Sequence, residues 1–424
     1  MLRLLILADD FTGALDTGVR FAARGIPTQV LTAKAHHFTE EDAEVLVIDT
    51  ETRHLSPTEA GKIVRALTES AIHAGVSCVY KKTDSALRGN VGAELEAALS
   101  GSGESVLPFL PAFPELGRTT VGGRHYINGI PVDESPFGKD PFEPVRTAEV
   151  TALLGLQSKL PAESFPPLAA DGTVPSRGGG ILIFDAASEE ELFASGRALF
   201  RKTVPRVLAG CAGFAAYLPD LLGLGARGES SLPALSPRLL VLCGSVNPIT
   251  RRQLSVAADA GFRHVHLTPQ EKVLPDFFAT AAGGVALQAL REQLREHPYL
   301  IIDSNDAGEN TETKNYAENL GLSLDELRCR IANALGTVLA GLIEEPALGT
   351  LLLTGGDTLL QCMNALGVRK VEPVGELESG IVLCRFSYRG KEHAVITKSG
   401  GFGEEDLLPR LARFLEKKTE GEKK

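Results

Sequence analysis

The chain has 424 residues, of which 43% are hydrophobic and 23% charged, and it carries a formal net charge of -11. This length exceeds what one ordinary hydrophobic core supports, so we expect two domains, and the composition excludes a chain that is disordered over most of its length. The negative charge argues against non-specific nucleic-acid binding, which needs a basic face that displaces counterions.

The first half of the chain alternates short apolar runs with longer amphipathic segments. This alternation indicates an α/β fold with a mostly parallel sheet, whose strands are apolar throughout because helices cover both faces. A stretch rich in proline and glycine, Pro108–Val145, is expected to be an irregular functional loop. The predicted strands are Leu4–Ala8, Ala43–Ile48, Cys78–Lys81, Ser105–Phe109 and Gly180–Phe184, and the predicted helices are Ala14–Arg24, Pro57–Ala74 and Gly92–Leu99.

The pattern breaks at Leu222–Arg238, which contains glycine, serine and proline and shows no periodicity. We therefore expect an N-terminal domain over residues 1–228, a C-terminal domain over 238–415 and a charged, solvated tail over 416–424. Each domain is predicted to hold a mostly parallel sheet flanked by helices. The second domain has strand candidates at Leu239–Cys243, Tyr299–Ile302, Leu351–Leu353, Val382–Phe386 and Ala394–Thr397, and helix candidates at Leu324–Leu342, with Ser323 as its N-cap, and Leu359–Gly367.

Two adjacent carboxylates, Asp9 and Asp10, follow the first predicted strand, and a Thr-Gly turn then opens a helix. Ligands of parallel sheets bind outside the carboxyl ends of the strands, so both carboxylates are placed where a ligand is expected. One of them could instead cap the helix that begins near Thr12, which would leave the other unexplained.

A second polar cluster follows the strand at Cys78–Lys81. Lys82 and Arg88 are suited to a substrate carboxylate, and Asp84 and Ser85 to its hydroxyl groups. A third cluster, with Arg118 and Thr119, lies in the proline-stiffened loop. Each cluster could also be a solvated loop without a role, but together they describe a site for a small, hydroxylated, acidic ligand.

The second domain contains three junctions at which a predicted strand runs into glycine: Gly244-Ser245, Gly355-Gly356-Asp357-Thr358 and Ser399-Gly400-Gly401. Glycine lets backbone N–H groups approach a phosphate, and a helix N-terminus adds positive partial charge. Asp357 or Thr358 could instead be only an N-cap. The chain has neither a P-loop motif nor a strand-linked G-x-G-x-x-G, so a P-loop nucleotidase and a dehydrogenase are disfavoured.

The histidines and cysteines indicate little chemistry. His264 and His266 have the spacing of one strand face, but no third metal ligand is evident, so a structural role is expected and no metal ligand is assigned. The six scattered cysteines are expected to be reduced and buried. No apolar run reaches the roughly 20 residues of a membrane helix and no signal peptide is apparent, so we expect a cytoplasmic protein that binds no membrane.

At these positions the chain resembles the four-carbon acid sugar kinases, a family long catalogued as a domain of unknown function. The resemblance covers essentially the whole chain except the tail, and residues 147–175 carry none of its motifs. It rests on six stretches: ADDFTGALD (Ala8–Asp16), KKTDSALRGNVGAEL (Lys81–Leu95), PAFPELGRTTVGGRHYINGIPVDES (Pro111–Ser135), GSVNPITRRQ (Gly244–Gln253), TGGDT (Thr354–Thr358) and KSGGFG (Lys398–Gly403).

The resemblance implies an N-terminal domain that binds a sugar acid through Asp10, the cluster from Lys82 to Arg88, and Arg118. It implies a C-terminal domain that binds ATP through Ser245, the turn from Gly355 to Thr358, and Gly400. The expected reaction is phosphoryl transfer from ATP to a hydroxyl of a four-carbon sugar acid such as threonate, erythronate or a keto-tetronate, with Mg²⁺ bridging the phosphates.

Asp10 is the first candidate for the base that orients the hydroxyl, and Asp84 the second. A homodimer is compatible with the sequence, which does not fix the oligomeric state. Two other readings are a phosphatase of the aspartyl-phosphate type and a non-enzymatic sugar-acid sensor. The first is disfavoured because adjacent Asp9 and Asp10 would diverge on a strand, the second because a sensor needs no phosphate cradle.

Overall fold

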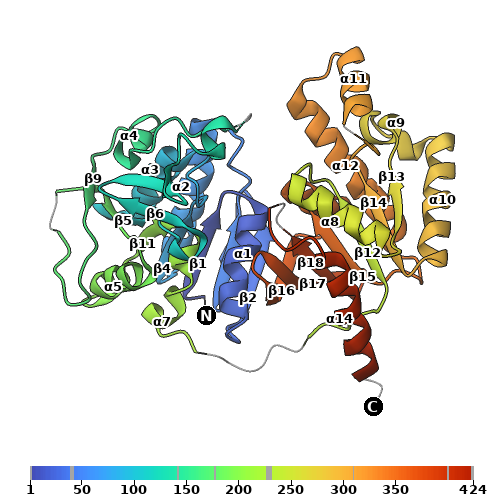
Figure 1. Ribbon diagram of the computed structural model, residues 1–424. Helices are drawn as coiled ribbons and strands as arrows, with labels where there is room; N and C mark the ends of the chain where they lie inside the picture. The colour runs from blue at the N-terminus through green and yellow to red at the C-terminus, as the bar shows by residue number, and fades with distance from the viewer. Residues whose placement is uncertain are drawn as a thin grey trace. The chain divides into compact units, whose positions relative to one another are not determined.

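A computed structural model describes residues 2–38, 43–140, 143–175, 178–225, 232–308, 310–398 and 401–421. The chain divides into two compact units, Met1–Ser230 and Ser231–Lys424, and each has its own sheet (Figure 1). The predicted fold class, α/β with a mostly parallel sheet flanked by helices in each part, is confirmed. No helix within the described ranges is both long enough and apolar enough to pass through a bilayer.

The sheet of the N-terminal unit is parallel throughout its described pairs. In spatial order the strands are β2 (Thr28–Thr32), β3 (Val45–Asp49), β1 (Leu4–Ala8), β4 (Cys78–Lys82), β11 (Val207–Gly210), β5 (Val106–Leu110), β10 (Gly180–Phe184) and β9 (Ala162–Phe165). The central strands are buried on both faces, and they are apolar except near their carboxyl ends, where Asp49 ends β3 and Lys81 and Lys82 end β4.

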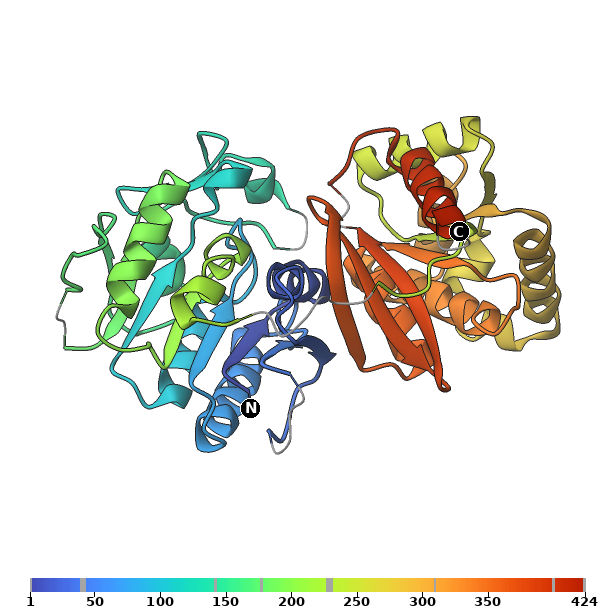
Figure 2. The ribbon, with the colours of Figure 1, turned by 90° about the horizontal axis from the view of Figure 1, so that it is seen from below.

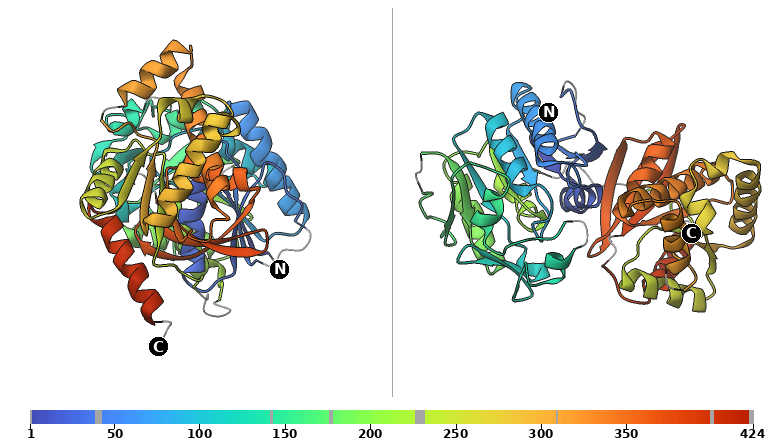
Figure 3. Two further views of the ribbon diagram at one scale, coloured as in Figure 1. Left: turned by 90° about the vertical axis from the view of Figure 1, so that its right-hand side faces the viewer. Right: turned by 90° about the horizontal axis from the view of Figure 1, so that it is seen from above.

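Helices cover both faces of this sheet, as Figures 2 and 3 show. The chain runs from β3 to β4 and from β4 to β5 in one direction across the sheet, and right-handed crossovers therefore place α2 and α3 on the same face. The crossovers through α1 and α5 run in the opposite direction and use the other face. The helices are α1 (Phe11–Ala22), α2 (Pro57–His73), α3 (Val91–Ser102), α4 (Val150–Gly155), α5 (Glu189–Phe200), α6 (Ala212–Ala215) and α7 (Leu218–Leu222).

The segment Pro108–Val145 is more ordered than expected. It contains a small antiparallel sheet of β6 (Arg118–Val121), β7 (Arg124–Ile127) and β8 (Ile130–Pro131), together with the 3-10 turns η1 (Pro114–Leu116) and η2 (Pro136–Lys139). The glycines that suggested an irregular loop lie at the tight turns between these strands, where Gly122, Gly123 and Gly129 have positive φ.

The sheet of the C-terminal unit is parallel at one side and ends in two antiparallel pairs. Leucine and valine side chains of its central strands pack against α8 and α14 on one face. Its strands, in spatial order, are β13 (Arg263–His266), β14 (Tyr299–Asp303), β12 (Leu239–Cys243), β15 (Thr350–Thr354), β18 (Lys391–Lys398), β17 (Ile381–Tyr388) and β16 (Lys370–Glu378).

The helices of this unit include the predicted one capped by Ser323, whose side chain and Glu326 form a capping box. The expected charged tail over 416–424 is helical as far as Gly421, because Leu407, Leu411 and Leu415 bury one side of that helix. The helices are α8 (Pro248–Asp259), α9 (Pro269–Val273), α10 (Ala281–Glu296), α11 (Thr311–Asn319), α12 (Leu324–Leu342), α13 (Gly356–Leu366) and α14 (Leu407–Gly421), with the 3-10 turn η3 (Phe277–Ala279).

The cysteines are free thiols, as predicted, and all but Cys329 are buried. Burial raises the pKa of Cys211 to about 11, so its sulfur is a neutral thiol at physiological pH.

Candidate functional site

The carboxyl ends of three neighbouring strands in the N-terminal unit lie level with one another. Ala8 at the end of β1 is the register partner of Asp49 in β3 and of Lys82 in β4. The residues that follow these strands therefore meet at one edge of the sheet, which is where parallel sheets bind their ligands.

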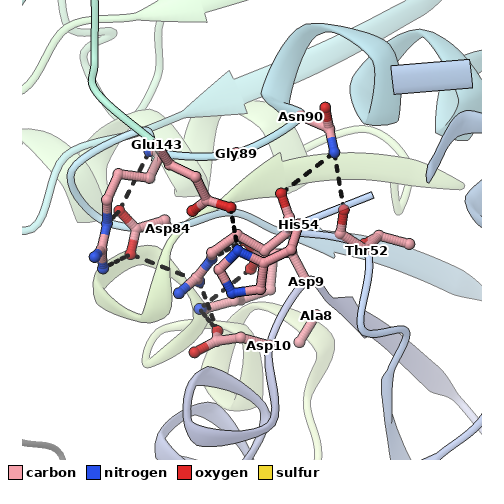
Figure 4. A network of polar contacts seen from close by, with 12 residues as sticks. Ala8, Asp9, Asp10, Thr52, His54, Asp84, Gly89, Asn90 and Glu143 are labelled. Atoms are coloured by element: carbon pink, nitrogen blue, oxygen red, sulfur yellow. Dashed lines mark hydrogen bonds and ion pairs between the residues drawn. The ribbon is translucent and has the colours of Figure 1, made fainter. Parts of the chain in front are cut away.

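Arg53, in the loop after β3, is the centre of this edge. Its Nε donates to Asp9 Oδ2 and its Nη2 to Asp10 Oδ1, each at 2.7 Å, and Nη2 also lies 3.6 Å from Asp84 Oδ1. Figure 4 shows the three carboxylates converging on this point. Arg53 was not among the predicted site residues, although the polar run Glu51-Thr52-Arg53-His54 follows a buried strand just as the predicted clusters do.

The carboxylate of Asp9 is 2% exposed but stays ionised. Burial alone would raise the pKa of Asp9, yet Arg53, Lys82 and Lys81 together hold it well below its ordinary value. Asp9 therefore acts as a fixed negative charge rather than as a group that takes up a proton near neutral pH.

Two expectations for the carboxylate pair are corrected. Asp10 stands at the N-cap position of α1, but its side chain makes no capping hydrogen bond. The two carboxylates also do not diverge: β1 ends at Ala8, so strand alternation no longer applies to Asp9 and Asp10, and both side chains reach Arg53.

Lys82 is a second cation beside the carboxylates of Asp9 and Asp10. Its Nζ lies 3.4 Å from Asp10 Oδ1 and 3.8 Å from Asp9 Oδ1. Burial opposes its charge, but Asp10 and Asp9 outweigh burial and raise the pKa of Lys82, which keeps the ammonium charged. Gly13 makes room for this ammonium, because a β-carbon there would overlap Lys82 Nζ and Asp10 Oδ1.

Asp84 and Arg88 are bound to each other in the loop after β4. Arg88 Nε and Nη2 each donate to the Asp84 carboxylate at 3.0 Å, and the backbone N–H groups of Ala86 and Arg88 donate to it as well. Burial works against the charge, but Arg88 and Arg53 hold the pKa of Asp84 well below its ordinary value. Asp84 is thus suited to shaping the loop, in which Leu87 is left-handed with φ 64°, more than to accepting a proton.

Arg118, at the start of β6, faces the same loop. Its Nη1 donates to the carbonyl of Leu116 at 2.7 Å, while its Nε is buried with no hydrogen-bond partner among the described residues. Burial lowers the pKa of Arg118. The nearby carboxylate of Asp84 acts in the opposite direction but offsets only part of this effect. The guanidinium groups of Arg88 and Arg118 lie 5.2 and 6.0 Å from the centre of the Phe137 ring.

Two further buried polar atoms at this edge lack hydrogen-bond partners within the described part of the chain: Asp9 Oδ1 and Thr83 Oγ1. Orphaned polar atoms are uncommon in native interiors and often mark the position of a ligand or water. With Arg118 Nε they offer two acceptors and one cationic donor, a set that suits a molecule with hydroxyl groups and a carboxylate. Two other predicted site residues lie near these in the sequence. Thr119 follows Arg118 on β6, Ser85 lies two residues after Thr83, and both are half-buried.

Two buried contacts hold the loops of this edge in place. Lys81 Nζ lies 3.1 Å from Glu94 Oε2 in α3, and Thr52 donates to the same carboxylate. Asn90 Nδ2 donates to the carbonyls of Thr52 and Leu55 at 2.8 Å each, and Figure 4 shows Asn90 above Thr52. These contacts hold the loop that carries Arg53 and so position its guanidinium.

His125, which the sequence analysis did not single out, ties the Asp84 loop to the small sheet. Its Nε2 donates to the carbonyl of Ser85 at 2.9 Å, and its Nδ1 lies 3.0 Å from Thr120 Oγ1. Burial lowers the pKa of His125 to about 4, so the ring is neutral at physiological pH. A neutral ring with Nε2 as donor matches both contacts.

In the C-terminal unit, two of the predicted glycine junctions lie side by side. Cys243 at the end of β12 is the register partner of Thr354 at the end of β15, and Gly244 N donates to the Thr354 carbonyl at 3.1 Å. Gly355 has φ 105°, which favours glycine, and stands at the N-cap of α13. A β-carbon on Gly244 would overlap Thr358 Oγ1, so the close approach of the two turns requires glycine there.

These turns have the features of an anion site. The N-terminus of α13 begins at Gly356, Ser245 lies opposite, and the buried Thr354 Oγ1 has no hydrogen-bond partner among the described residues. Asp357 forms an ion pair with Arg328 Nη1 at 3.3 Å and is partly exposed in the first turn of α13. Lys398, the register partner of Thr354 on β18, is buried and donates to Thr250 Oγ1 at 2.9 Å. Gly400, predicted to contact ATP, lies outside the described residues.

Two family models match the chain. Residues 4–218 match the model described as "Sugar-binding N-terminal domain", and residues 240–408 match "Nucleotide-binding C-terminal domain".

Relatives of known name match over nearly the whole length. The chain is 31% identical to a D-threonate kinase of Salmonella typhimurium, over 98% of this chain and 99% of the relative. It is 28% identical to a D-erythronate kinase of Heliobacterium modesticaldum, over 100% and 99%, and 26% identical to a 3-oxo-tetronate kinase of Methylobacterium radiotolerans, over 96% and 98%.

Solved structures share the fold. A crystal structure of a Salmonella typhimurium LT2 protein has a TM-score of 0.80 at 21% identity, covering 97% of this chain and 99% of that one. A Haemophilus influenzae protein has a TM-score of 0.72 at 20% identity, covering 95% and 98%.

Proposed function

Because the chain belongs to the four-carbon acid sugar kinase family, we propose that it transfers the γ-phosphate of ATP to a hydroxyl group of a four-carbon sugar acid. D-Threonate is the first substrate to test, since three relatives with 30% identity or more are named D-threonate kinases. The relatives are named as kinases of D-threonate, D-erythronate or 3-oxo-tetronate, so nothing supports the alternative functions of a phosphatase or a sensor.

The observation that carries the proposal is the set of orphaned buried atoms at the edge of the N-terminal sheet. The Nε of Arg118 supplies a cationic donor for the substrate carboxylate, and Asp9 Oδ1 and Thr83 Oγ1 supply acceptors for its hydroxyl groups. Arg88 is the weaker candidate for the carboxylate, because its guanidinium is already held by Asp84.

We assign the role of orienting base to Asp10. Its side chain is 26% exposed, against 2% for Asp9 and 10% for Asp84, so a substrate hydroxyl can reach it. Arg53 and Lys82 hold its carboxylate in one place. In phosphoryl transfer such a residue mainly positions the attacking hydroxyl, and most of the catalysis comes from alignment and charge neutralisation.

The nucleotide is assigned to the turns of the C-terminal unit. Backbone N–H groups at Ser245 and from Gly355 to Thr358 would face the phosphates, aided by the N-terminal end of α13. Asp357, a carboxylate in the first turn of α13, is the residue that would hold Mg²⁺, and the ion would supply charge neutralisation at the phosphates. The reaction is placed in the cytoplasm, where ATP is available and free thiols stay reduced.

The test is ADP release from the full-length protein with a panel of D-threonate, L-threonate, D-erythronate and the neutral four-carbon polyols. At least one acid should support turnover, and the polyols should not. Arg118→Met should raise KM for the acid by about 100-fold, equivalent to about 2.7 kcal/mol, and leave KM for ATP unchanged. Equal turnover of acids and polyols, or an unchanged KM in Arg118→Met, would contradict the proposal.

The Asp10→Asn variant tests whether Asp10 acts as the base or only helps to bind the sugar acid. We expect kcat to fall by about 10²–10⁴-fold while the melting temperature still rises with the sugar acid, because the other binding atoms remain. Asp84→Asn should instead weaken sugar-acid binding, since it releases Arg88 and the loop around Leu87. An Asp10→Asn variant with undiminished kcat would end the assignment.

A further inference from the structure

We propose that His264, His266 and Asp303 form a binding site for a divalent transition metal, with coordination chemistry suited to Zn²⁺. The histidines are two residues apart on β13, so they share one face, and His266 is the register partner of Asp303 on β14. One candidate ligand atom from each residue lies within 4.8 Å of the other two. The third ligand, which the sequence did not reveal, is supplied by strand pairing.

The distances fit an ion without rearrangement of the backbone. His264 Nε2 lies 3.1 Å and His266 Nδ1 3.8 Å from the same oxygen, Asp303 Oδ2, and the two imidazole rings are 4.1 Å apart. Ligands of one tetrahedral zinc ion lie about 3.4 Å apart, so the His264–Asp303 pair is already close to this spacing.

The surrounding hydrogen bonds orient these ligands. Asn305 donates from its backbone N and its Nδ2 to Asp303 Oδ1, at 2.9 and 2.8 Å, which leaves Oδ2 for the histidines. His266 Nδ1 donates to the Asn305 carbonyl at 2.8 Å, so its Nε2 carries the lone pair that binds a metal. Outer partners of this kind are typical of metal-binding carboxylates and imidazoles.

A purely structural hydrogen bond explains less. Hydrogen bonds account for one nitrogen of each ring, His264 Nε2 with Asp303 and His266 Nδ1 with the Asn305 carbonyl, but they do not require two imidazoles 4.1 Å apart beside one carboxylate. Asp303 is 3% exposed, whereas His264 and His266 are 18% and 30% exposed, so an ion has a route from solvent. Imidazole ligands favour zinc, cobalt or nickel over magnesium, which separates this site from the Mg²⁺ that accompanies ATP.

The experiment uses the full-length protein after treatment with a chelator. Titration with Zn²⁺ in a calorimeter, and with Co²⁺ by visible absorption, should give one ion per chain and a tetrahedral Co²⁺ spectrum. His264→Ala and His266→Ala should each weaken Zn²⁺ affinity by more than about 100-fold, and Asn305→Ser by about 10-fold, because the outer hydrogen bonds are lost. Added Zn²⁺ should raise the melting temperature of the parent protein and not that of either histidine variant.

Two matched variants control for binding elsewhere in the same unit. His297→Gln removes a histidine outside the cluster, and Cys329→Ser removes an exposed thiol, a second type of group with affinity for zinc. Both should keep the parent affinity and stoichiometry. Unchanged affinity in His264→Ala and His266→Ala, loss of binding in Cys329→Ser, or a stoichiometry well below one ion per chain would overturn the proposal.

Discussion

Gly13, in the first turn of α1, leaves the space that the Lys82 ammonium occupies. Gly13→Ala should fold, because alanine favours the helix and the displaced atom is the end of a flexible side chain. The variant should push Lys82 away from Asp10, and we expect kcat/KM for the sugar acid to fall by at least about tenfold, or 1.4 kcal/mol. Steady-state kinetics and a melting curve measure the two effects.

Gly61→Ala is the matched control for this substitution. Gly61 lies in α2, and its added β-carbon would meet only ordinary contacts, the nearest being the Ala93 carbonyl at 3.6 Å. Its kcat/KM should equal that of the parent protein. A Gly13→Ala variant that is as active as Gly61→Ala would show that the position of Lys82 does not matter.

Arg53 is predicted to be the most sensitive residue of the N-terminal site. Arg53→Gln leaves Asp9 buried without its closest cation, and breaking a buried ion pair in this way costs about 3–5 kcal/mol in the free energy of unfolding. Arg53→Lys should cost less stability but still lower kcat/KM by about tenfold, since an ammonium cannot bridge Asp9 and Asp10 as the planar guanidinium does. Urea denaturation and steady-state kinetics measure both.

The control for Arg53 is Arg65→Gln, which removes an exposed ion pair with Glu69. Such surface changes stay within about 0.5 kcal/mol. If Arg53→Gln were as stable as Arg65→Gln, Lys82, Lys81 and Arg88 would have to neutralise the carboxylate cluster without Arg53.

Stability should fall in mild acid because of His125. Above pH 6.5, its ordinary pKa, the ring is neutral in both the folded and the unfolded chain, and its contribution is complete. As the pH falls from 6.5 towards about 4, the unfolded chain binds a proton that the folded chain does not, so the free energy of unfolding decreases by up to about 3 kcal/mol. Urea denaturation at pH 7 and pH 4.5 measures this loss, which should be smaller in His125→Gln. An identical pH dependence in the two proteins would assign the acid loss to other groups.

The two turns proposed for the nucleotide are tested by Gly244→Ala. The new β-carbon would overlap Thr358 Oγ1 and force the turns apart, so we expect the Kd for ADP to rise by at least about tenfold, or 1.4 kcal/mol. The melting-temperature rise caused by the sugar acid should not change. Gly284→Ala, in α10 with open space around it, is the control and should bind ADP normally. Equal ADP affinity in both variants would show that the phosphates do not bind at this pair of turns.

The sequence predicted best those features that depend on neighbouring residues alone. Strand β1 has the predicted bounds Leu4–Ala8, because an apolar run buried on both faces needs no partner to be recognised. The capping box at Ser323 is equally local. Strand Lys370–Glu378 was missed because Pro373 and its acidic residues break the apolar pattern by which a buried strand is recognised.

Features that depend on strand register could not be predicted. Arg53 and Asp303 lie far along the chain from the groups they contact, and only the pairing of β1 with β3 and of β13 with β14 brings them there. The role proposed for Arg88 differs from the expectation for a local reason, a contact with a residue four positions earlier in the same loop. Its charge suggested a substrate ligand, whereas the folded loop binds it to Asp84 and leaves Arg118 as the cation with an orphaned donor.

Asp9 and Arg53 are separated by 44 residues, and Asp10 and Lys82 by 72. A ribosome that adds about 5–20 residues per second therefore releases the two acids several seconds before the cations that neutralise them. In that interval the apolar segment Leu4–Ala8 has neither β3 nor β4 to pair with. Until β3 and β4 have been made, we expect the segment Leu4–Ala8 to be a binding site for a chaperone.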